Sequence, residues 1–209
     1  MELLGKKINF LGDSITEGVG ASTYEHCYFS RFAAMTGALC RNYGISGTRF
    51  ARRRVPHENP RFDLDFCGRY QEMDDDADII VVFGGTNDYG HGDAPLGAME
   101  DRTVWSFYGA CHVLFSGLIA KYPGKTIVIL TPMHRESELD KNPGLRAFVQ
   151  AEREVAEFYS LPVLDMWSRL GIQPLVPEQK ALYMDDHVHP NDLGHEKIAY
   201  TLKRFLENI

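Results

Sequence analysis

The sequence is poor in cysteine and has none of the cysteine spacings that are typical of a metal-binding site. Only four cysteines occur in 209 residues, and no two of them form a Cys-x-x-Cys pair. A compact disulfide framework and a cysteine-based zinc site are therefore not expected. We predict reduced, partly buried thiols at these positions: Cys27, Cys40, Cys67 and Cys111.

Long apolar segments are also missing. The longest apolar runs, Ile79–Phe83 and Ile127–Leu130, have the length of a strand, whereas a membrane helix needs about 20 apolar residues. The first residues, Met1–Lys7, lead straight into an apolar, strand-like run and lack the hydrophobic region and cleavage site of an export signal. These absences predict a cytoplasmic protein without a membrane span.

Positive charge is in deficit, with 22 Lys and Arg against 29 Asp and Glu and a net charge of −7. Neither nucleic acid nor an anionic membrane surface is therefore expected as the main partner. The hydrophobic fraction of 44% and the charged fraction of 24% are those of an ordinary globular protein. The length suits one domain over residues 1–209.

Strand-like and helix-like segments alternate along the chain. This alternation predicts an α/β fold with three α/β/α layers around a mostly five-stranded parallel sheet. The strand of residues 38–42 is expected at the edge of the sheet. The expected strands cover residues 8–11, 38–42, 78–83, 125–130 and 162–165. Helices are expected from residue 22 or 23 to 35 and over residues 103–121, 145–159 and 191–206. Residues 48–77, with one short helix, and residues 134–143 and 166–185 are expected as loops.

The stretch Leu11–Gly18, with the sequence Leu-Gly-Asp-Ser-Ile-Thr-Glu-Gly, exposes a serine where the first predicted strand ends. Three distant stretches carry further polar groups near structural boundaries. They are Asn42–Gly47, Gly84–Asp88 and Asp186–Asn191. In parallel α/β sheets ligands bind beyond the carboxyl ends of the strands. We therefore expect all four stretches to meet at one edge of the sheet.

Read in this order, the four motifs resemble those of the GDSL/SGNH hydrolase family, whose fold is flavodoxin-like. The resemblance implies that Ser14 is a nucleophile and that Asp186 and His189 complete a triad with it. It also implies an oxyanion hole formed by the Ser14 amide, Gly44 and Asn87. The sequence has Ile15 where the family name has leucine, an apolar exchange that leaves the chemistry unchanged.

The chemistry of these residue types agrees with the implied roles. A histidine such as His189 titrates near neutral pH and can take the proton of a serine hydroxyl. A carboxylate three residues earlier, that of Asp186, can reach the other ring nitrogen and fix the tautomer. Asp185 and Asp165 compete for this last role. Because side chains alternate along an extended segment, only one of His187 and His189 is expected to face the site.

Each of these residues also has a structural interpretation. Ser14 could cap a helix, His189 could bind backbone at a helix entry, and glycine or asparagine is common in turns. An alternative chemical interpretation is a metal-dependent hydrolase built on the acidic and histidine residues between 185 and 195, namely Asp185, Asp186, His187, His189, Asp192 and His195. A third is a binding module without catalysis. A Gly-x-Ser-x-Gly elbow is absent, which disfavours an α/β-hydrolase.

The main hypothesis is a serine esterase that cleaves an oxygen ester of a small molecule through an acyl-enzyme, with no metal or organic cofactor. A short acyl group, such as acetyl on a carbohydrate, is preferred because no long apolar lid is present. The arginines between 49 and 54 could bind a substrate anion or form a solvated surface. The aromatic residues Trp105, Trp167 and Tyr183 could form a sugar platform or belong to the core. The sequence carries no signal for an oligomeric state.

Overall fold

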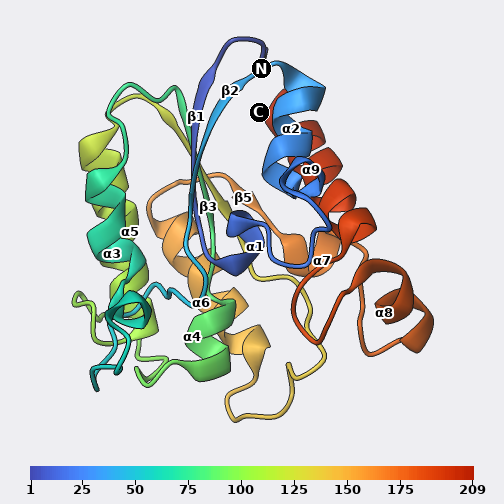
Figure 1. Ribbon diagram of the computed structural model, residues 1–209. Helices are drawn as coiled ribbons and strands as arrows, with labels where there is room; N and C mark the ends of the chain where they lie inside the picture. The colour runs from blue at the N-terminus through green and yellow to red at the C-terminus, as the bar shows by residue number, and fades with distance from the viewer.

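The computed structural model describes residues 1–209 and contains one sheet of five parallel strands (Figure 1). The strands are β1 (Lys7–Gly12), β2 (Leu39–Gly44), β3 (Ile79–Phe83), β4 (Thr126–Leu130) and β5 (Val163–Leu164). Their spatial order is β2-β1-β3-β4-β5, which is the flavodoxin-like order. The predicted α/β fold and the edge position of the second strand are thus confirmed.

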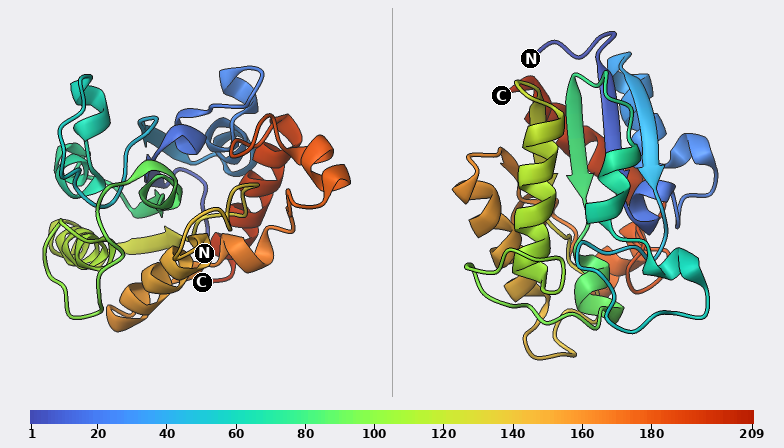
Figure 2. Two further views of the ribbon diagram at one scale, coloured as in Figure 1. Left: turned by 90° about the horizontal axis from the view of Figure 1, so that it is seen from below. Right: turned by 90° about the vertical axis from the view of Figure 1, so that its left-hand side faces the viewer.

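Helices cover both faces of the sheet (Figure 2). The helices α2 (Tyr28–Thr36) and α9 (Asp192–Glu207) cover one face. The helices α3 (Phe66–Arg69), α5 (Phe107–Lys121) and α6 (Leu145–Phe158) cover the other. Side chains of β3 alternate between two apolar cores, so that Val81 packs towards α2 and α9 while Val82 packs towards α5 and α6. Burial on both faces explains why this strand is apolar throughout.

The helix predicted from residue 22 or 23 begins later. A short 3₁₀ helix, η1 (Tyr24–His26), precedes α2. Ser22 does not cap α2, because its amide and its hydroxyl both donate to the Asp192 carboxylate, each over 2.7 Å. The end of α2 is as predicted: Gly37 follows it with a φ of 69°, in the left-handed conformation that glycine adopts without strain.

Several segments predicted as loops contain short helices. They are η2 (Pro60–Asp63), α3, η3 (Tyr70–Glu72), α7 (Met166–Arg169) and α8 (Pro177–Tyr183). A further short helix, α4 (Thr86–His91), follows β3. Most have only one or two turns, too few to show a helical period in the sequence. Side-chain caps stabilise some of them: Asp65 accepts a hydrogen bond from Gly68 N over 2.7 Å, and Asp165 accepts one from Ser168 N over 3.2 Å.

The carboxyl ends of the strands point to one edge of the sheet, the lower edge in Figure 1, where α1 (Ser14–Glu17) and α4 lie. The four predicted motifs therefore come together at this edge. None of the four cysteines forms a disulfide. No helix combines the length and the apolar character that crossing a bilayer would require.

Candidate active site

Ser14 lies at the first position of α1, directly after the turn that ends β1. Asp13 caps this helix, because its carboxylate accepts a hydrogen bond from Ile15 N over 3.0 Å. Gly12 allows the close approach of strand and helix: a Cβ at this position would lie 1.9 Å from Thr16 Oγ1. The sharp turn holds the Ser14 side chain at the strand end.

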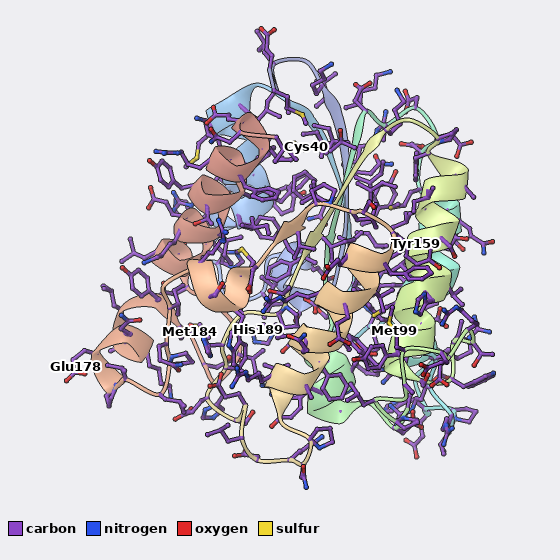
Figure 3. All side chains as sticks on the ribbon, turned by 180° about the vertical axis from the view of Figure 1, so that it is seen from behind. Cys40, Met99, Tyr159, Glu178, Met184 and His189 are labelled. Carbon is purple, nitrogen blue, oxygen red and sulfur yellow. The ribbon has the colours of Figure 1, made fainter.

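Ser14, His189 and Asp186 form a continuous hydrogen-bonded chain. Ser14 Oγ lies 2.9 Å from His189 Nε2, and His189 Nδ1 lies 2.8 Å from Asp186 Oδ2. A carboxylate only accepts, so Nδ1 carries the proton and Nε2 is left to accept the serine proton. The segment that carries His189 is held by a bridge between Met184 and Pro190; Met184 and His189 are labelled in Figure 3.

The Asp186 carboxylate stays ionised. Partial burial alone would raise its pKa, but hydrogen bonds from His189 Nδ1 and from the amides of His189 and Val188 lower the pKa to about 2. A permanent negative charge fixes the imidazole tautomer and stabilises the imidazolium. His187 points elsewhere and bonds to Glu136, so only one of the two histidines faces Ser14, as predicted. Asp165 caps α7 instead.

Three hydrogen-bond donors beside the Ser14 hydroxyl are not used up by the protein. The amides of Ser14 and Gly47 donate to no protein acceptor. Asn87 Nδ2 donates to Thr48 O over 3.0 Å, which leaves its second proton free. Gly47 has a φ of 78°, in the left-handed region that glycine adopts without strain.

The predicted donor Gly44 does not fit this geometry. Its amide donates to Asn42 Oδ1 over 2.8 Å, and the residue does not line the pocket beside Ser14. Gly44 is the last residue of β2, and a Cβ there would lie 2.3 Å from the backbone nitrogen of Glu17. The position needs glycine because α1 packs against it. The unbonded amide of the same motif belongs to Gly47, which sequence reasoning missed.

Buried polar residues hold the donor loops in place. The Asp88 carboxylate accepts from Phe50 N over 2.9 Å and from Ala51 N over 2.8 Å, so it ties α4 to the loop after β2. Burial raises the Asp88 pKa to about 7, although these bonds oppose the shift. Arg69 Nη1 bridges Gly12 O and Thr48 Oγ1 over 3.1 Å and 2.7 Å. These hydrogen bonds therefore connect the elements that carry Ser14, Gly47 and Asn87.

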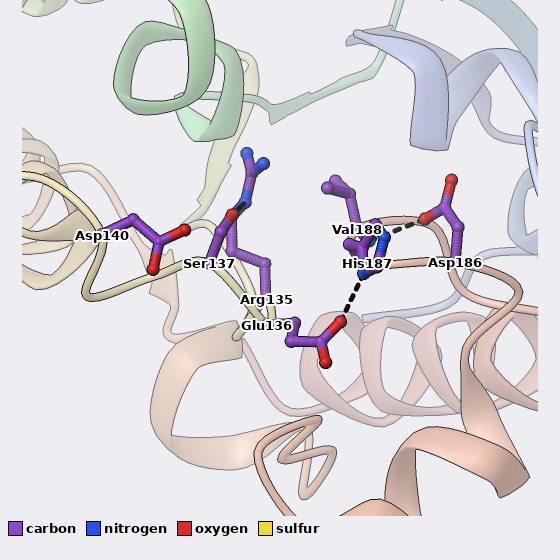
Figure 4. A pocket seen from close by; sticks show the side chains of 7 residues that line it. All are labelled: Arg135, Glu136, Ser137, Asp140, Asp186, His187 and Val188. Atoms are coloured by element: carbon purple, nitrogen blue, oxygen red, sulfur yellow. Dashed lines mark hydrogen bonds and ion pairs between the residues drawn. The ribbon is translucent and has the colours of Figure 1, made fainter.

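A pocket of about 390 Å³, here called the Ser14 pocket, opens over these groups. It is lined by Ser14, Val19, Ser46, Gly47, Asn87, Gly90, His91, Arg135, Val188 and His189. Burial and the nearby Arg49 cation lower the His91 pKa to about 4, so this ring is neutral at pH 7. A neighbouring outer pocket of about 480 Å³ shares Arg135 and Val188 with it (Figure 4). The site is thus small, although most of the residue types that line it are polar.

Other predicted binding residues lie outside the Ser14 pocket. Arg49 is almost fully buried and donates to Phe62 O over 2.7 Å, and Arg52 pairs with Asp65. Arg49 is therefore unavailable to a substrate anion, whereas Arg52 and Arg54 are exposed and agree with the interpretation as a solvated surface. The aromatic residues Trp105, Trp167 and Tyr183 do not line the pocket either.

The acidic and histidine residues between 185 and 195 are dispersed. Asp192 pairs with His26 over 3.0 Å, and His195 lies between Tyr28 N and Val19 O, on the core side of α9. No group of three or more His, Cys, Asp or Glu side chains is placed to hold a metal ion. The geometry therefore does not favour the metal-site interpretation of this segment.

Comparisons with known proteins agree on the family. A model described as the GDSL-like lipase/acylhydrolase family matches residues 10–197. A solved protein from Lactobacillus plantarum is 32% identical, with a TM-score of 0.85 over 99% of this chain and 98% of its own. One described as a GDSL-like lipase, from Bacteroides uniformis, is 21% identical, with a TM-score of 0.75 over 98% and 97%. No curated protein matches the chain significantly.

Proposed function

The chain belongs to the GDSL-like lipase/acylhydrolase family, and we propose that it is a serine esterase that cleaves a carboxylic oxygen ester through an acyl-enzyme. The observation that supports this most directly is the hydrogen-bonded chain from Ser14 through His189 to Asp186, with links of 2.9 Å and 2.8 Å. Both distances lie in the range that proton transfer needs.

In acylation, Ser14 Oγ attacks the ester carbonyl carbon while His189 Nε2 takes the hydroxyl proton. The carbon–oxygen bond to the alcohol then breaks, and the imidazolium returns its proton to the leaving alkoxide. The Asp186 carboxylate, which stays ionised even at pH values far below neutral, stabilises the imidazolium during this step.

In deacylation, water takes the place of the alcohol. His189 removes a proton from the water, which attacks the acyl-enzyme carbonyl, and the serine leaves with that proton restored. The reaction needs no metal or organic cofactor, because His189 supplies both the base and the acid.

The developing oxyanion receives hydrogen bonds from the amides of Ser14 and Gly47 and from Asn87 Nδ2. We assign Gly47 to this role in place of Gly44, because the Gly44 amide is bonded to Asn42 whereas the Gly47 amide is free. A donor already held in position costs little reorganisation when charge develops on the carbonyl oxygen.

We propose a short acyl group, such as acetyl, and a small polar alcohol such as a carbohydrate. Of the ten residues that line the Ser14 pocket, only two, Val19 and Val188, are hydrophobic. A volume of about 390 Å³ suits a small ester better than a long fatty acyl chain.

The test is hydrolysis of 4-nitrophenyl acetate by the purified protein and by Ser14→Ala, each with and without chelator. We expect activity that survives the chelator and falls at least about a hundredfold in the variant. Ser116→Ala, on the exposed side of α5, is the matched control and is expected to keep full activity. Chelator-sensitive activity that persists in Ser14→Ala would favour a metal-dependent hydrolase. Absence of hydrolysis across a panel of acetyl esters would favour a binding module.

A further inference from the structure

Arg135 carries the only permanent charge among the residues that line the Ser14 pocket. It lies five residues after the end of β4, in the segment 134–143 that the sequence predicted as a loop. The pocket contains no Lys, Asp or Glu, and its other charge-capable groups are His91 and the catalytic base His189. The substrate therefore meets one fixed cation near the reacting serine.

The contacts of Arg135 use only part of its donor capacity. Nη1 donates to Thr86 O over 3.2 Å and to Thr86 Oγ1 over 3.3 Å, and Nε donates to Ser137 Oγ over 3.0 Å. Nη2 has no protein partner, and it is not one of the buried, unbonded atoms of the structure. A guanidinium has five N–H donors, so two of them remain available to a ligand.

No carboxylate of the protein forms an ion pair with this cation, although the charges of Asp140, Asp186 and Asp13 act on its pKa from a distance. Two of the three acidic residues of the outer pocket are bonded to other groups. Glu136 accepts from Lys180 over 2.7 Å and bonds to His187, and Asp186 holds His189. In Figure 4 the side chains of Arg135 and Glu136 extend in opposite directions.

The pocket is shaped around the guanidinium. A Cβ at Gly90 would lie 2.7 Å from Arg135 Nη1, so a larger residue there would push the side chain out of place. The Thr86 bonds fix the guanidinium next to Asn87, one of the proposed oxyanion donors. An arginine held by neutral acceptors, with one nitrogen facing solvent, is suited to bind a carboxylate.

We propose that Arg135 binds a carboxylate of the substrate, so that this enzyme prefers esters whose acyl or alcohol part is negatively charged. The inference rests on the proposed esterase function and names its substrate class. Charge-assisted hydrogen bonds contribute about 1.5–3 kcal/mol, which corresponds to a preference of roughly 10- to 100-fold.

Two pairs of esters test the preference and distinguish its source. The acyl pair is the 4-nitrophenyl monoester of glutarate and 4-nitrophenyl valerate, and the alcohol pair is O-acetyl-lactate and isopropyl acetate. The measured quantity is the ratio of kcat/KM for the charged ester to that for the neutral ester. We expect Arg135→Gln to lower this ratio about 10- to 100-fold in one pair, with the neutral ester changed by less than about threefold.

Arg135→Lys, which keeps the charge but not the planar fork, is expected to retain part of the preference. Arg146→Gln, an exposed arginine on α6, is the matched control and should leave both ratios unchanged. Equal losses on charged and neutral esters would overturn the inference, since Arg135 would then only support α4. Ratios that Arg135→Gln leaves unchanged in both pairs would also overturn it.

A binding measurement separates this inference from the esterase proposal. Calorimetry follows glutarate and lactate binding to Ser14→Ala, which cannot form the acyl-enzyme, and to Ser14→Ala with Arg135→Gln. Binding of either anion that disappears in the double variant would support the carboxylate site even if no ester is hydrolysed. Ester hydrolysis without charge preference and without anion binding would leave the esterase proposal standing and reject the site.

Discussion

Glu152 on α6 makes the stability of this protein depend on pH. Its side chain is fully buried, and neither carboxylate oxygen has a hydrogen-bond partner. Oε2 lies 3.3 Å from the place that a Cβ would take at Gly85, the residue that precedes α4. Burial raises the pKa of Glu152 well above its ordinary value of 4.5, and the charges of Asp88, Asp165 and Asp13 add to the shift. The folded protein therefore keeps the Glu152 proton to a higher pH than the unfolded chain does.

The sign of the effect follows from proton binding. Between the ordinary pKa and the raised one, the folded state holds a proton on Glu152 that the unfolded state has released. The free energy of unfolding therefore falls as pH rises, by about 1.4 kcal/mol per pH unit from this group. Asp13 and Asp88, whose pKa values burial raises to about 6 and about 7, contribute slopes of the same sign.

Glu152→Gln should remove the Glu152 slope while keeping nearly the same shape. Because Asp13 and Asp88 are unchanged, their contributions cancel when the variant is compared with wild type. At pH values between the ordinary and the raised pKa, we expect the variant to gain about 1.4 kcal/mol relative to wild type for each pH unit. For a chain of this length this corresponds to roughly 3–5 °C in Tm per pH unit.

The assay is equilibrium urea unfolding at pH 5, 6 and 7 for wild type, Glu152→Gln and Glu157→Gln. Glu157 lies on the same helix but is exposed, so its variant should follow the wild-type slope. If wild type and Glu152→Gln show parallel dependences on pH, the folded protein does not hold a proton on Glu152 and the reasoning is refuted.

Two further substitutions test the proposed oxyanion hole and its frame. Asn87→Ala removes one donor and should lower kcat about 10²- to 10³-fold with KM nearly unchanged; a loss confined to KM in steady-state kinetics would contradict this role. Gly44→Ala places a Cβ 2.3 Å from the backbone nitrogen of Glu17, which should cost about 1–3 kcal/mol and lower Tm by roughly 2–12 °C. An unchanged melting curve for Gly44→Ala would show that α1 does not pack against β2 as described.

The long elements were predictable because their sequence pattern and their burial agree. The run Ile79–Phe83 is apolar because both faces of β3 are covered. Such a pattern can be recognised without knowing the details of the tertiary packing. The helix α8 was missed because its seven residues contain no fully buried side chain. Without a row of buried apolar residues along one face, the sequence of α8 shows no helical period.

The sequence shows which chemical groups lie at the site. It does not show which of them are already hydrogen-bonded within the protein. Gly44 and Gly47 lie in one motif, and only the contact from the Gly44 amide to Asn42 shows which amide is occupied. Gly47 could have been suspected because it lies beyond the strand end rather than in it. Arg135 gives no such signal, since its lack of a counter-ion depends on where Glu136 and Asp140 point.

The hydrogen bond between Ser14 and His189 joins residues that are 175 positions apart. During synthesis Ser14 is added early and His189 almost last, so on the proposed mechanism a partly translated chain lacks the base that activates its nucleophile. The same separation makes ester hydrolysis a reporter of completed folding. In a refolding experiment, turnover returns only after α9 and the segment before it have docked onto the first strand–helix unit, whereas helical content recovers earlier from local contacts.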